Sequence, residues 1–460
     1  MTSADVAVIG AGPAGLMAAW RAAQHGHSVV VLEAGPAVGG MAGSFEIEGV
    51  RVDYGSHRLH PSIDERTLGE LRSLLGDDLQ VRSRRGRVRL ADRWVAFPLQ
   101  LADLVRQLPP SFAARAAAGA AVTPMLRPRA DTSAEVIRAS LGPAVAQEFY
   151  EPYLTKLWGL SPHQLSGELA RRRVSARSPL DLVRRALRGS SGSGRTFLYP
   201  RRGYGQISEA LADAAVDAGA DIHLREPVER VALDAGAVRL STRDGVVEAA
   251  RVWSTAPVSA LAPMVDPAPG PEVMASAASL EHRALVLVYL LLDRPAYTAF
   301  DAHYFPSLAN PVSRLSEPKR YRDGDDPRDR TVVCAEVPCS VDDPIWRSSD
   351  EELQGTVAHA LAREGLPRVD AQAVVTRRVP RVYPLYRVGF ERHLDALQQW
   401  MSAQDRLLVF GRQGLFVQDN THHVLAMGAA AADSLASDGS FDERRWRRAR
   451  DGFAGHVVED

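Results

Sequence analysis

The chain has 460 residues, of which 45% are hydrophobic and 24% are charged, and its 55 basic and 56 acidic side chains leave a formal net charge of -1. This length allows two or three domains and a deep ligand site, and the composition is that of a globular protein. A net charge near zero excludes the overall basic field with which nucleic-acid-binding proteins attract their partner, so we expect no nucleic-acid partner.

No segment has the run of about 18 apolar residues that a membrane-spanning helix needs, and the N-terminus lacks the basic start of a signal peptide. The two cysteines, Cys334 and Cys339, are too few for a disulfide framework, and their spacing would place them on opposite faces of one strand. We therefore expect a cytoplasmic protein without a transmembrane segment.

Three segments at the N-terminus predict a β-α-β unit. A buried strand is expected over Asp5–Ile9, a helix over Pro13–His25 and a second strand over Ser28–Leu32. From Leu68 to Ser190 helical periodicity dominates, and prolines divide this run into several helices. The stretch GSSGSG at 189–194 predicts a flexible loop, which we expect to form the edge of a mobile lid.

The second half of the chain predicts alternating strands and helices. The expected elements are a helix over Gln206–Asp217, strands within Ile222–Trp253, a central strand over Ala284–Leu292, a strand over Val332–Val337, and helices over Glu351–Glu364 and Asn420–Leu435. The basic cluster Arg444–Arg450 predicts a solvated terminal helix rather than a site for an anionic partner.

The turn GAGPAG at residues 10–15 lies between the first strand and the first helix, the position of a dinucleotide-binding motif. Gly10 allows the tight turn, Gly12 lets the backbone approach a pyrophosphate, and Gly15 lets the helix pack against the strand. Pro13 takes the first helical position, where its missing N–H is not needed, and Ala14 follows it. The helix N-terminus then offers free amides and a positive dipole end to phosphates.

A carboxylate and a second glycine-rich stretch follow this turn. Glu33, with Ala34 beside it, ends the second strand, where it can accept hydrogen bonds from ribose hydroxyls and disfavours the 2′-phosphate of NADP. The stretch VGGMAGS at 38–44 contains Gly39, Gly40 and Met41 and gives further unhindered amides. The sequence therefore predicts a longer dinucleotide, FAD.

This combination resembles the two-dinucleotide-binding flavoproteins. In that resemblance the segment around Val228 is the strand beside adenine, and WSTAP at 253–257 returns to the cofactor. The stretch GRQGLF at 411–416 leads to a helix with Asn420 as N-cap, whose N-terminus is expected to point at the flavin pyrimidine. The residues expected to bind FAD are Gly10, Gly12, Pro13, Ala14, Gly15, Glu33, Ala34, Gly39, Gly40, Met41, Val228, Gly411, Arg412, Asp419 and Asn420.

Further motifs, in collinear order, resemble UDP-galactopyranose mutase and, more distantly, protoporphyrinogen oxidase and the amine oxidases. They are YGSHRLH at 54–60, YLTKLWG at 153–159, RVSAR at 173–177, PVSRLSEPK at 311–319 and VYPL at 382–385. We expect an α/β protein with a discontinuous Rossmann-type FAD-binding domain, a helical substrate or lid domain, an antiparallel-sheet substrate domain and a basic tail. Their expected ranges are 1–62, 195–265 and 395–440 for FAD binding, 63–194 for the helical domain, 266–394 for the sheet domain and 441–460 for the tail.

The resemblance also implies the site residues. Arg177 and Arg314 match the arginines that hold a substrate diphosphate, a role that suits guanidinium groups because they bind phosphate bidentately and keep their charge; both could instead be ordinary surface arginines. Trp158 could stack on a base or sugar or be a core anchor. The expected catalytic residues are His57, His60, Arg177, Arg314, Tyr383 and Gln418, and the expected substrate contacts are Trp158, Arg177, Tyr199, Arg314, Tyr383 and Tyr386.

Two positions depart from the mutase pattern. Gln418 stands where a diphosphate-binding tyrosine is expected, and Asn420 stands where an aspartate is expected. Four tyrosines could compensate for the missing one, namely Tyr199, Tyr204, Tyr383 and Tyr386.

Histidine pairs raise the question of a metal site. His57 with His60, and His422 with His423, do not bring a third ligand at a convincing spacing, so we expect no metal.

Two enzyme functions and one binding function fit these residues. The first is a mutase-like enzyme that acts through flavin N5 on a nucleotide-activated or phosphorylated sugar-like substrate, interconverting pyranose and furanose rings with no net redox change. It would need a small anionic substrate and a flavin reductant. The second is an FAD-dependent oxidoreductase that moves hydride from substrate to flavin. Gln418 favours the second and the paired arginine motifs favour the first. The third is a flavin-binding scaffold.

Overall fold

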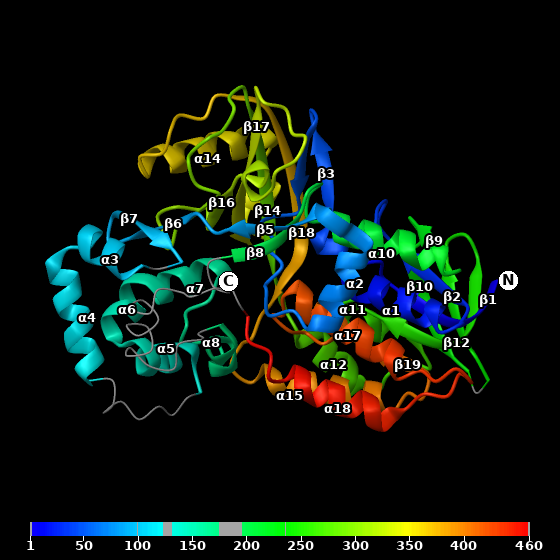
Figure 1. Ribbon diagram of the computed structural model, residues 1–460. Coiled ribbons are helices and arrows are strands. Elements are labelled where there is room, and N and C mark those ends of the chain that lie inside the picture. The colour runs from blue at the N-terminus through cyan, green and yellow to red at the C-terminus, as the bar shows by residue number, and fades with distance from the viewer. Residues whose placement is uncertain (1, 99, 123–130, 174–195, 235, 459–460) are drawn as a thin grey trace.

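The computed structural model describes residues 2–98, 100–122, 131–173, 196–234 and 236–458 (Figure 1). Its strands are β1 Thr2–Ile9, β2 Val29–Glu33, β3 Ser44–Ile47, β4 Val50–Asp53, β5 Leu79–Ser83, β6 Gly86–Leu90, β7 Arg93–Phe97, β8 Thr196–Pro200, β9 Asp221–Leu224, β10 Val228–Leu233, β11 Val238–Thr242, β12 Val246–Ser254, β13 Val265–Asp266, β14 His282–Leu292, β15 Ala302–Tyr304, β16 Arg314–Ser316, β17 Thr331–Cys339, β18 Ala371–Pro384 and β19 Leu407–Val409.

The α-helices are α1 Pro13–Gln24, α2 Glu65–Leu75, α3 Leu101–Gln107, α4 Pro110–Val122, α5 Ser133–Leu141, α6 Pro143–Val145, α7 Glu151–Trp158, α8 Gly167–Arg173, α10 Gln206–Asp217, α11 Val258–Leu261, α12 Pro271–Ser279, α13 Pro344–Arg347, α14 Asp350–Arg363, α15 Phe390–Ser402, α16 Gly411–Gly414, α17 Thr421–Asp433 and α18 Glu443–Phe453. Single turns of other helix types are η1 Gly40–Ala42, η2 Gly76–Asp78, η4 Ala146–Tyr150, η5 Ala262–Met264 and η6 Pro318–Tyr321.

An eight-stranded sheet holds the N-terminus. Its order is β13-β10-β11-β12-β1-β2-β9, and β19 also pairs with β12. β1 lies parallel to both β2 and β12. Helices α1, α10 and α17 pack on one face, and α12 and α15 pack on the other, so the central strands are apolar on both sides. This is the Rossmann-type α/β arrangement, and the prediction of that fold class is confirmed.

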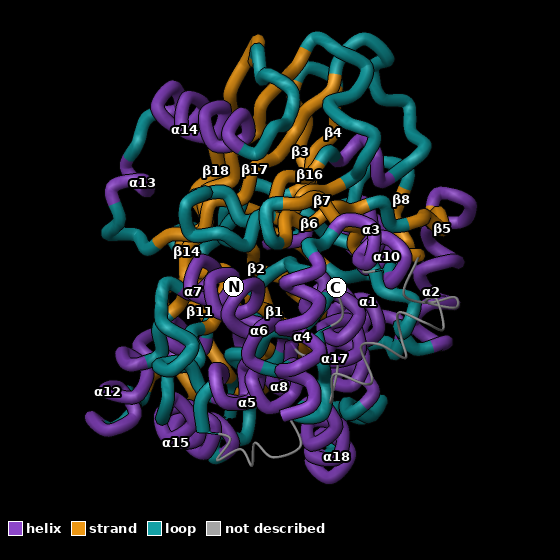
Figure 2. Tube along the Cα trace, turned by 90° about the vertical axis from the view of Figure 1, so that its left-hand side faces the viewer, coloured by secondary structure: helices purple, strands orange, loops and turns teal. Residues whose placement is uncertain are grey.

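The seven-stranded sheet has the order β18-β14-β17-β16-β15-β6-β7. β14 lies between β17 and β18 and is buried from Ala284 to Leu292, which confirms the expected central strand. Cys334 and Cys339 on β17 belong to apolar clusters on opposite faces, as their spacing predicts. Figure 2 shows this sheet in the upper part of the molecule, with helices α5, α8 and α15 below.

The expectation of helices throughout Leu68–Ser190 is wrong for part of that range. Residues 79–97 form three strands: β5 pairs with β8, while β6 and β7 form a hairpin that joins the seven-stranded sheet through β15. Buried and partly exposed residues alternate along β6, which suits a strand with one face on the core. Ala91 and Asp92 at the hairpin tip both have positive φ, the backbone that a two-residue hairpin turn needs.

The C-terminal helix α18 is anchored to the body of the protein. Its arginines are largely exposed, in line with the expected solvated helix, but Trp446 and Phe453 are buried in the core that contains α1 and α17. After α18 the chain runs back to the helices at the left of Figure 1, where the amide of Val458 donates to the carbonyl of Arg172 at 2.7 Å. Among the described helices none is long and apolar enough to span a membrane.

Candidate active site

The turn after β1 is packed tightly on one side and open on the other. A Cβ at Gly10, where φ is +102°, would lie 2.4 Å from Thr255 Oγ1, and a Cβ at Gly15 would lie 2.1 Å from the carbonyl oxygen of Gly10. A Cβ at Gly12 would meet no atom within 4 Å. The space in front of Gly12 therefore remains open at the N-terminus of α1, where a phosphate is best placed.

The second glycine-rich stretch lies against the first. The Gly39 amide donates to the Ala11 carbonyl at 2.8 Å, and a Cβ at Gly40 would lie 3.6 Å from Gly12 Cα. Glu33 Oε2 accepts a hydrogen bond from the Ala11 amide at 2.8 Å. Its Oε1 accepts one from the Gly35 amide at 2.7 Å, so the carboxylate braces the whole turn.

Other residues expected to bind the cofactor converge on the same place. The amides of Arg225 and Glu226, just before Val228, donate to the carbonyls of Gly35 and Glu33, both at 2.9 Å. From the far end of the chain, a Cβ at Gly411 would lie 3.3 Å from Ala14 Cβ, and Gln413 Nε2 lies 3.5 Å from Met41 Sδ. Ala34 is exposed beside them.

Helix α17 packs on α1 and so lies beside the glycine-rich turns. Asn420 is its N-cap, as expected, and the Asn420 amide donates to His423 Nδ1 at 3.3 Å. A Cβ at Gly428 would lie only 2.2 Å from the carbonyl oxygen of Ala14, so the two helices meet with their backbones in contact.

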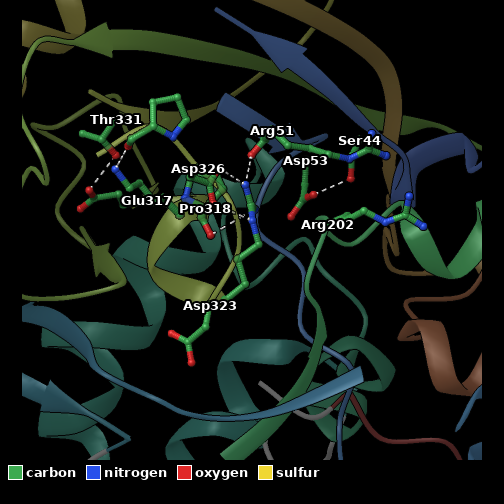
Figure 3. A network of polar contacts seen from close by, with 12 residues as sticks. Ser44, Arg51, Asp53, Arg202, Glu317, Pro318, Asp323, Asp326 and Thr331 are labelled. Carbon is green, nitrogen blue, oxygen red and sulfur yellow. Dashed lines mark hydrogen bonds and ion pairs between the residues drawn. The ribbon is translucent and has the colours of Figure 1, made fainter. Parts of the chain in front are cut away.

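Asp53, the last residue of β4, is a fully buried carboxylate that fixes the loop after it. Its Oδ1 accepts a hydrogen bond from Ser44 Oγ at 2.6 Å, drawn as a dashed line in Figure 3, and one from the Tyr204 amide at 2.9 Å. Its Oδ2 accepts one from the hydroxyl of Tyr199. The Tyr289 hydroxyl donates to the Asp53 carbonyl at 2.6 Å. This network positions the segment 54–57 and was missed by the sequence analysis.

His57 and His60 follow in that segment. His57 Nε2 lies 2.9 Å from the carbonyl oxygen of Tyr54, so Nε2 carries the proton and Nδ1 is the acceptor. Burial lowers the pKa of the His57 imidazole, which keeps the ring neutral. His60 Nδ1 lies 2.7 Å from Ser62 Oγ, and its ring centroid is 5.9 Å from that of His422. The two histidines therefore have separate surroundings.

Arg314 is held by a buried acid. Its Nε and Nη2 lie 2.9 and 2.8 Å from Glu336 Oε1, and its Nη2 also donates to the Ser56 carbonyl at 3.2 Å. Glu336 is 2% exposed and accepts a further hydrogen bond from the Ser56 amide at 2.9 Å. Arg314 thus links strand β17 to the loop at Ser56. Glu336 was not predicted from the sequence, although it is the single acid within the apolar segment TVVCAEVPC and a buried charge needs a partner.

Two other arginines converge on Tyr383. The guanidinium carbons of Arg173 and Arg412 lie 5.9 and 5.8 Å from the centre of the Tyr383 ring, and that of Arg173 lies 4.7 Å from the Trp158 ring. Arg412 donates to the carbonyls of Asp419 and Val382 at 2.9 and 3.3 Å. Burial, followed by the charge of Arg173, lowers the pKa of Arg412.

Neither guanidinium has a carboxylate partner among the residues that the structure describes. Arg173 donates one long hydrogen bond, of 3.4 Å, to Gln418 Oε1. Gln418 is fully buried and donates from Nε2 to the Pro384 carbonyl at 2.7 Å. Arg412 was expected on the cofactor side, yet its guanidinium lies beside Tyr383. Arg173, Arg412 and Tyr383 therefore form a cluster of positive charge, which we call the arginine pocket.

Of the residues expected to contact substrate, two are buried in the core and one lies outside the described residues. Tyr199 is fully buried with its hydroxyl on Asp53, and Tyr386 is 1% exposed, donates to the Phe416 carbonyl at 2.9 Å and stacks on Phe390. Both tyrosines are core residues, and these surroundings do not suit the substrate contacts expected of them. Arg177, like the loop at 189–194, lies outside the described residues.

A cluster near the N-terminus of α17 deserves comparison with a metal site. Asp419, His423 and His456 bring ligand-type atoms within 4.8 Å of one another. His456 Nδ1 already lies 2.6 Å from Asp419 Oδ2, and the Arg172 guanidinium is 3.8 Å from Asp419 Oδ1. Since a cation would be repelled by that guanidinium, we interpret the cluster as a hydrogen-bonded pair with a neighbouring imidazole. Burial, and then the neighbouring imidazoles, lower the pKa of His423 to about 2.

Comparison with known proteins decides the family. The model of the flavin-containing amine oxidoreductases matches residues 13–410. The chain belongs to this family. It is therefore an FAD-dependent flavoenzyme of the amine oxidase type, which confirms the predictions of FAD and of an enzyme.

Individual relatives show how widely the fold is shared. A crystal structure of reduced UDP-galactopyranose mutase is 21% identical with a TM-score of 0.80, and the match covers 97% of both chains. A structure assigned as a protoporphyrinogen oxidase from Exiguobacterium sp. 255-15 is 19% identical with a TM-score of 0.72, over 94% of this chain and 98% of that one. Putrescine oxidase of Kocuria rosea is 42% identical over 82 residues, which span 18% of this chain and 17% of the oxidase.

The open face of Gly12 fits the FAD of this family and gives a test. Because φ at Gly12 is -78° and its Cβ would meet no atom, we expect Gly12→Ala to leave the melting temperature of the cofactor-free protein unchanged. The methyl group would instead enter the space for the pyrophosphate, and we expect FAD affinity to fall about tenfold or more, which is about 1.4 kcal/mol. Equilibrium titration with FAD measures this, and an unchanged affinity would place the pyrophosphate elsewhere.

Proposed function

We propose that this flavoenzyme acts on an anionic substrate, a nucleotide-activated or phosphorylated sugar, and interconverts its ring forms without net oxidation. The observation that carries the proposal is the arginine pocket, where Arg173 and Arg412 face Tyr383 and have no carboxylate partner among the described residues. Two half-buried guanidiniums beside one ring repel each other, and a bound diphosphate would compensate both charges.

The same charges argue against an amine substrate. A protonated amine entering between Arg173 and Arg412 would meet two positive charges at short range and in a poorly solvated place. Selection by repulsion of the wrong charge is a common basis of specificity. The similarity to putrescine oxidase therefore supports the fold and the cofactor but not an amine substrate.

The residues of the arginine pocket have distinct roles in this proposal. Arg173 and Arg412 bind and orient the diphosphate. Burial raises the pKa of the Tyr383 hydroxyl, so it stays protonated and can donate a hydrogen bond to a substrate oxygen. Trp158 is 1% exposed beneath Arg173, so it orients that guanidinium rather than stacking on a base. Bound FAD supplies the nucleophilic or hydride-transferring chemistry at N5.

A second candidate is the net oxidation of an anionic substrate. This oxidation is favoured because two residues that the mutase resemblance assigns to the substrate already bind other protein groups. Arg314 is already paired with Glu336, and Gln418 donates its amide to Pro384. The described residues thus offer fewer free groups for a nucleoside diphosphate than the resemblance implies.

One experiment separates the two candidates. Nucleotide sugars are added anaerobically to one sample in which the flavin has been reduced and to another in which it is oxidised, and sugar isomers and the flavin spectrum are followed in both. Isomer formation while the flavin stays reduced supports the ring interconversion. Bleaching of the oxidised flavin by substrate, with no isomer formed, would replace it with the oxidation.

The charge of the arginine pocket is tested with inorganic pyrophosphate. We expect Arg173→Met to weaken pyrophosphate binding to the holoenzyme by about 10- to 100-fold. This is the change in affinity that corresponds to the loss of one hydrogen bond to a charged group. Arg72→Met, at an exposed position of α2, is the matched control for net charge. Calorimetric titration measures both, and equal affinity in the two variants would remove Arg173 from the site.

A further inference from the structure

Three hydrogen bonds join the segment after α18 to other described parts of the chain, all near the arginine pocket. The Arg172 Nη2 donates to the Ala454 carbonyl at 3.4 Å, the Val458 amide donates to the Arg172 carbonyl at 2.7 Å, and His456 Nδ1 lies 2.6 Å from Asp419 Oδ2. The burial of Trp446 and Phe453 fixes the start of this segment. The segment after α18 is thus held at both of its ends.

Arg172 is the point at which these contacts meet. Besides its two contacts with the tail, its Nε donates to Glu168 at 2.7 Å within α8, and its Nη1 lies 3.8 Å from Asp419 Oδ1. Arg172 is in the last turn of α8, and its carbonyl accepts the hydrogen bond from the Val458 amide.

Asp419 connects the tail to α17. The carboxylate is 2% exposed, with Arg172 on one side and His456 on the other. The His456 ring stacks on His423 with centroids 4.1 Å apart and planes 11° apart. His456 therefore donates to a buried carboxylate while its ring lies against the first turn of α17.

We propose that Ala454–Val458 is a strap that holds Arg173 in the arginine pocket, with His456 as its positioning residue; this inference rests on the proposed function. Arg173 directly follows Arg172, and its hydrogen bond goes to Gln418, the neighbour of Asp419. The strap fastens Arg172 to Asp419, so it sets the distance between the backbones that carry Arg173 and Gln418. A guanidinium held in place loses less entropy when it binds an anion.

Substitution of His456 tests the strap. An asparagine at this position can place its Nδ2 near the present Nδ1 and donate to Asp419, whereas a leucine cannot. We expect His456→Leu to weaken pyrophosphate binding to the holoenzyme about tenfold and His456→Asn to restore most of it, since the lost contact is a hydrogen bond to a charged group. Melting temperature and FAD content are measured for both variants, because a purely structural role would lower these in step with binding.

The backbone contact gives a second, independent pair of variants. Val458→Pro removes the amide that donates to Arg172, and Val458→Ala keeps it, so we expect only the proline variant to bind pyrophosphate more weakly. Normal binding by both His456→Leu and Val458→Pro would overturn the strap. Equal losses in the leucine and asparagine variants, accompanied by loss of FAD, would also overturn it.

These outcomes are distinct from a failure of the proposed function. If Arg173→Met leaves pyrophosphate affinity unchanged, the anion site itself is wrong, whatever the tail variants do. If Arg173→Met weakens binding and the tail variants do not, the anion site stands and the strap alone is rejected.

Discussion

Gly428→Ala is expected to lower the free energy of unfolding by about 3 kcal/mol or more, the upper range for overpacking a closely packed core. The new Cβ would lie 2.2 Å from the carbonyl oxygen of Ala14 and 3.2 Å from the Ala18 amide nitrogen, and both are backbone atoms that cannot rotate away. Helix α17 would have to move off α1, whose first turn is the predicted site of the FAD pyrophosphate. We therefore expect FAD retention to fall together with stability.

Gly355→Ala is the matched control. Gly355 is also inside a helix, α14, but its Cβ would meet nothing within 4 Å, and the position is exposed. Alanine there should stabilise the protein by about 0.5 to 1 kcal/mol, the difference in helix propensity. Urea unfolding followed by circular dichroism measures both variants. Equal stability of the two would show that α1 and α17 are not in backbone contact.

Glu336→Gln is expected to cost about 3 to 5 kcal/mol of stability, because it leaves the buried charge of Arg314 without its partner. Burial is the largest influence on the pKa of Arg314 and lowers it, but Glu336 and the neighbouring tyrosines together raise this pKa well above the usual value. In the variant the guanidinium still cannot escape the penalty by losing its proton, because arginine stays protonated in proteins. Glutamine keeps the shape of the side chain and its acceptor oxygen for the Ser56 amide, so the charge is the main change.

The double variant Glu336→Gln with Arg314→Met is the internal control. Removing both charges should recover a large part of the lost stability, since an apolar replacement of a buried ion pair is often neutral. The wild type, the two single variants and the double variant form a double-mutant cycle in chemical denaturation. The interaction energy from this cycle measures how strongly Arg314 and Glu336 stabilise one another. Additive losses would mean that Arg314 and Glu336 do not act on one another in solution.

The cofactor region could be predicted from the sequence because its rules are local. Gly10 and Gly15 are required by the packing of one turn, Gly12 leaves space in front of that turn, and Asn420 is recognisable as a cap from its neighbours alone. The second glycine-rich stretch is close to the first in sequence, so the two together predict one binding site.

The arginine pocket could not be predicted in the same way. Arg173 contacts Gln418 across 245 residues, so no spacing in the sequence links them. The contact of Ser56 with Glu336, the acid that holds Arg314, likewise spans 280 residues. The motif RVSAR contains two arginines, and only the fold shows that the first of them faces Tyr383. The hairpin β6–β7 was not predicted because its alternation of apolar and polar residues is short and lies in an Arg-rich segment. Pairing with β15, which is distant in the sequence, stabilises it.

The packing of α1 on α17 also has a consequence during synthesis. The apolar side of α1, which includes Leu16, Met17 and Trp20, leaves the ribosome about 400 residues before α17 can cover it. At about 5 to 20 residues per second, the part of that side that α17 covers stays uncovered for roughly 20 to 80 s. The nascent chain is therefore expected to depend on a ribosome-associated chaperone, and stalling before residue 421 should leave an aggregation-prone fragment that cannot retain its cofactor.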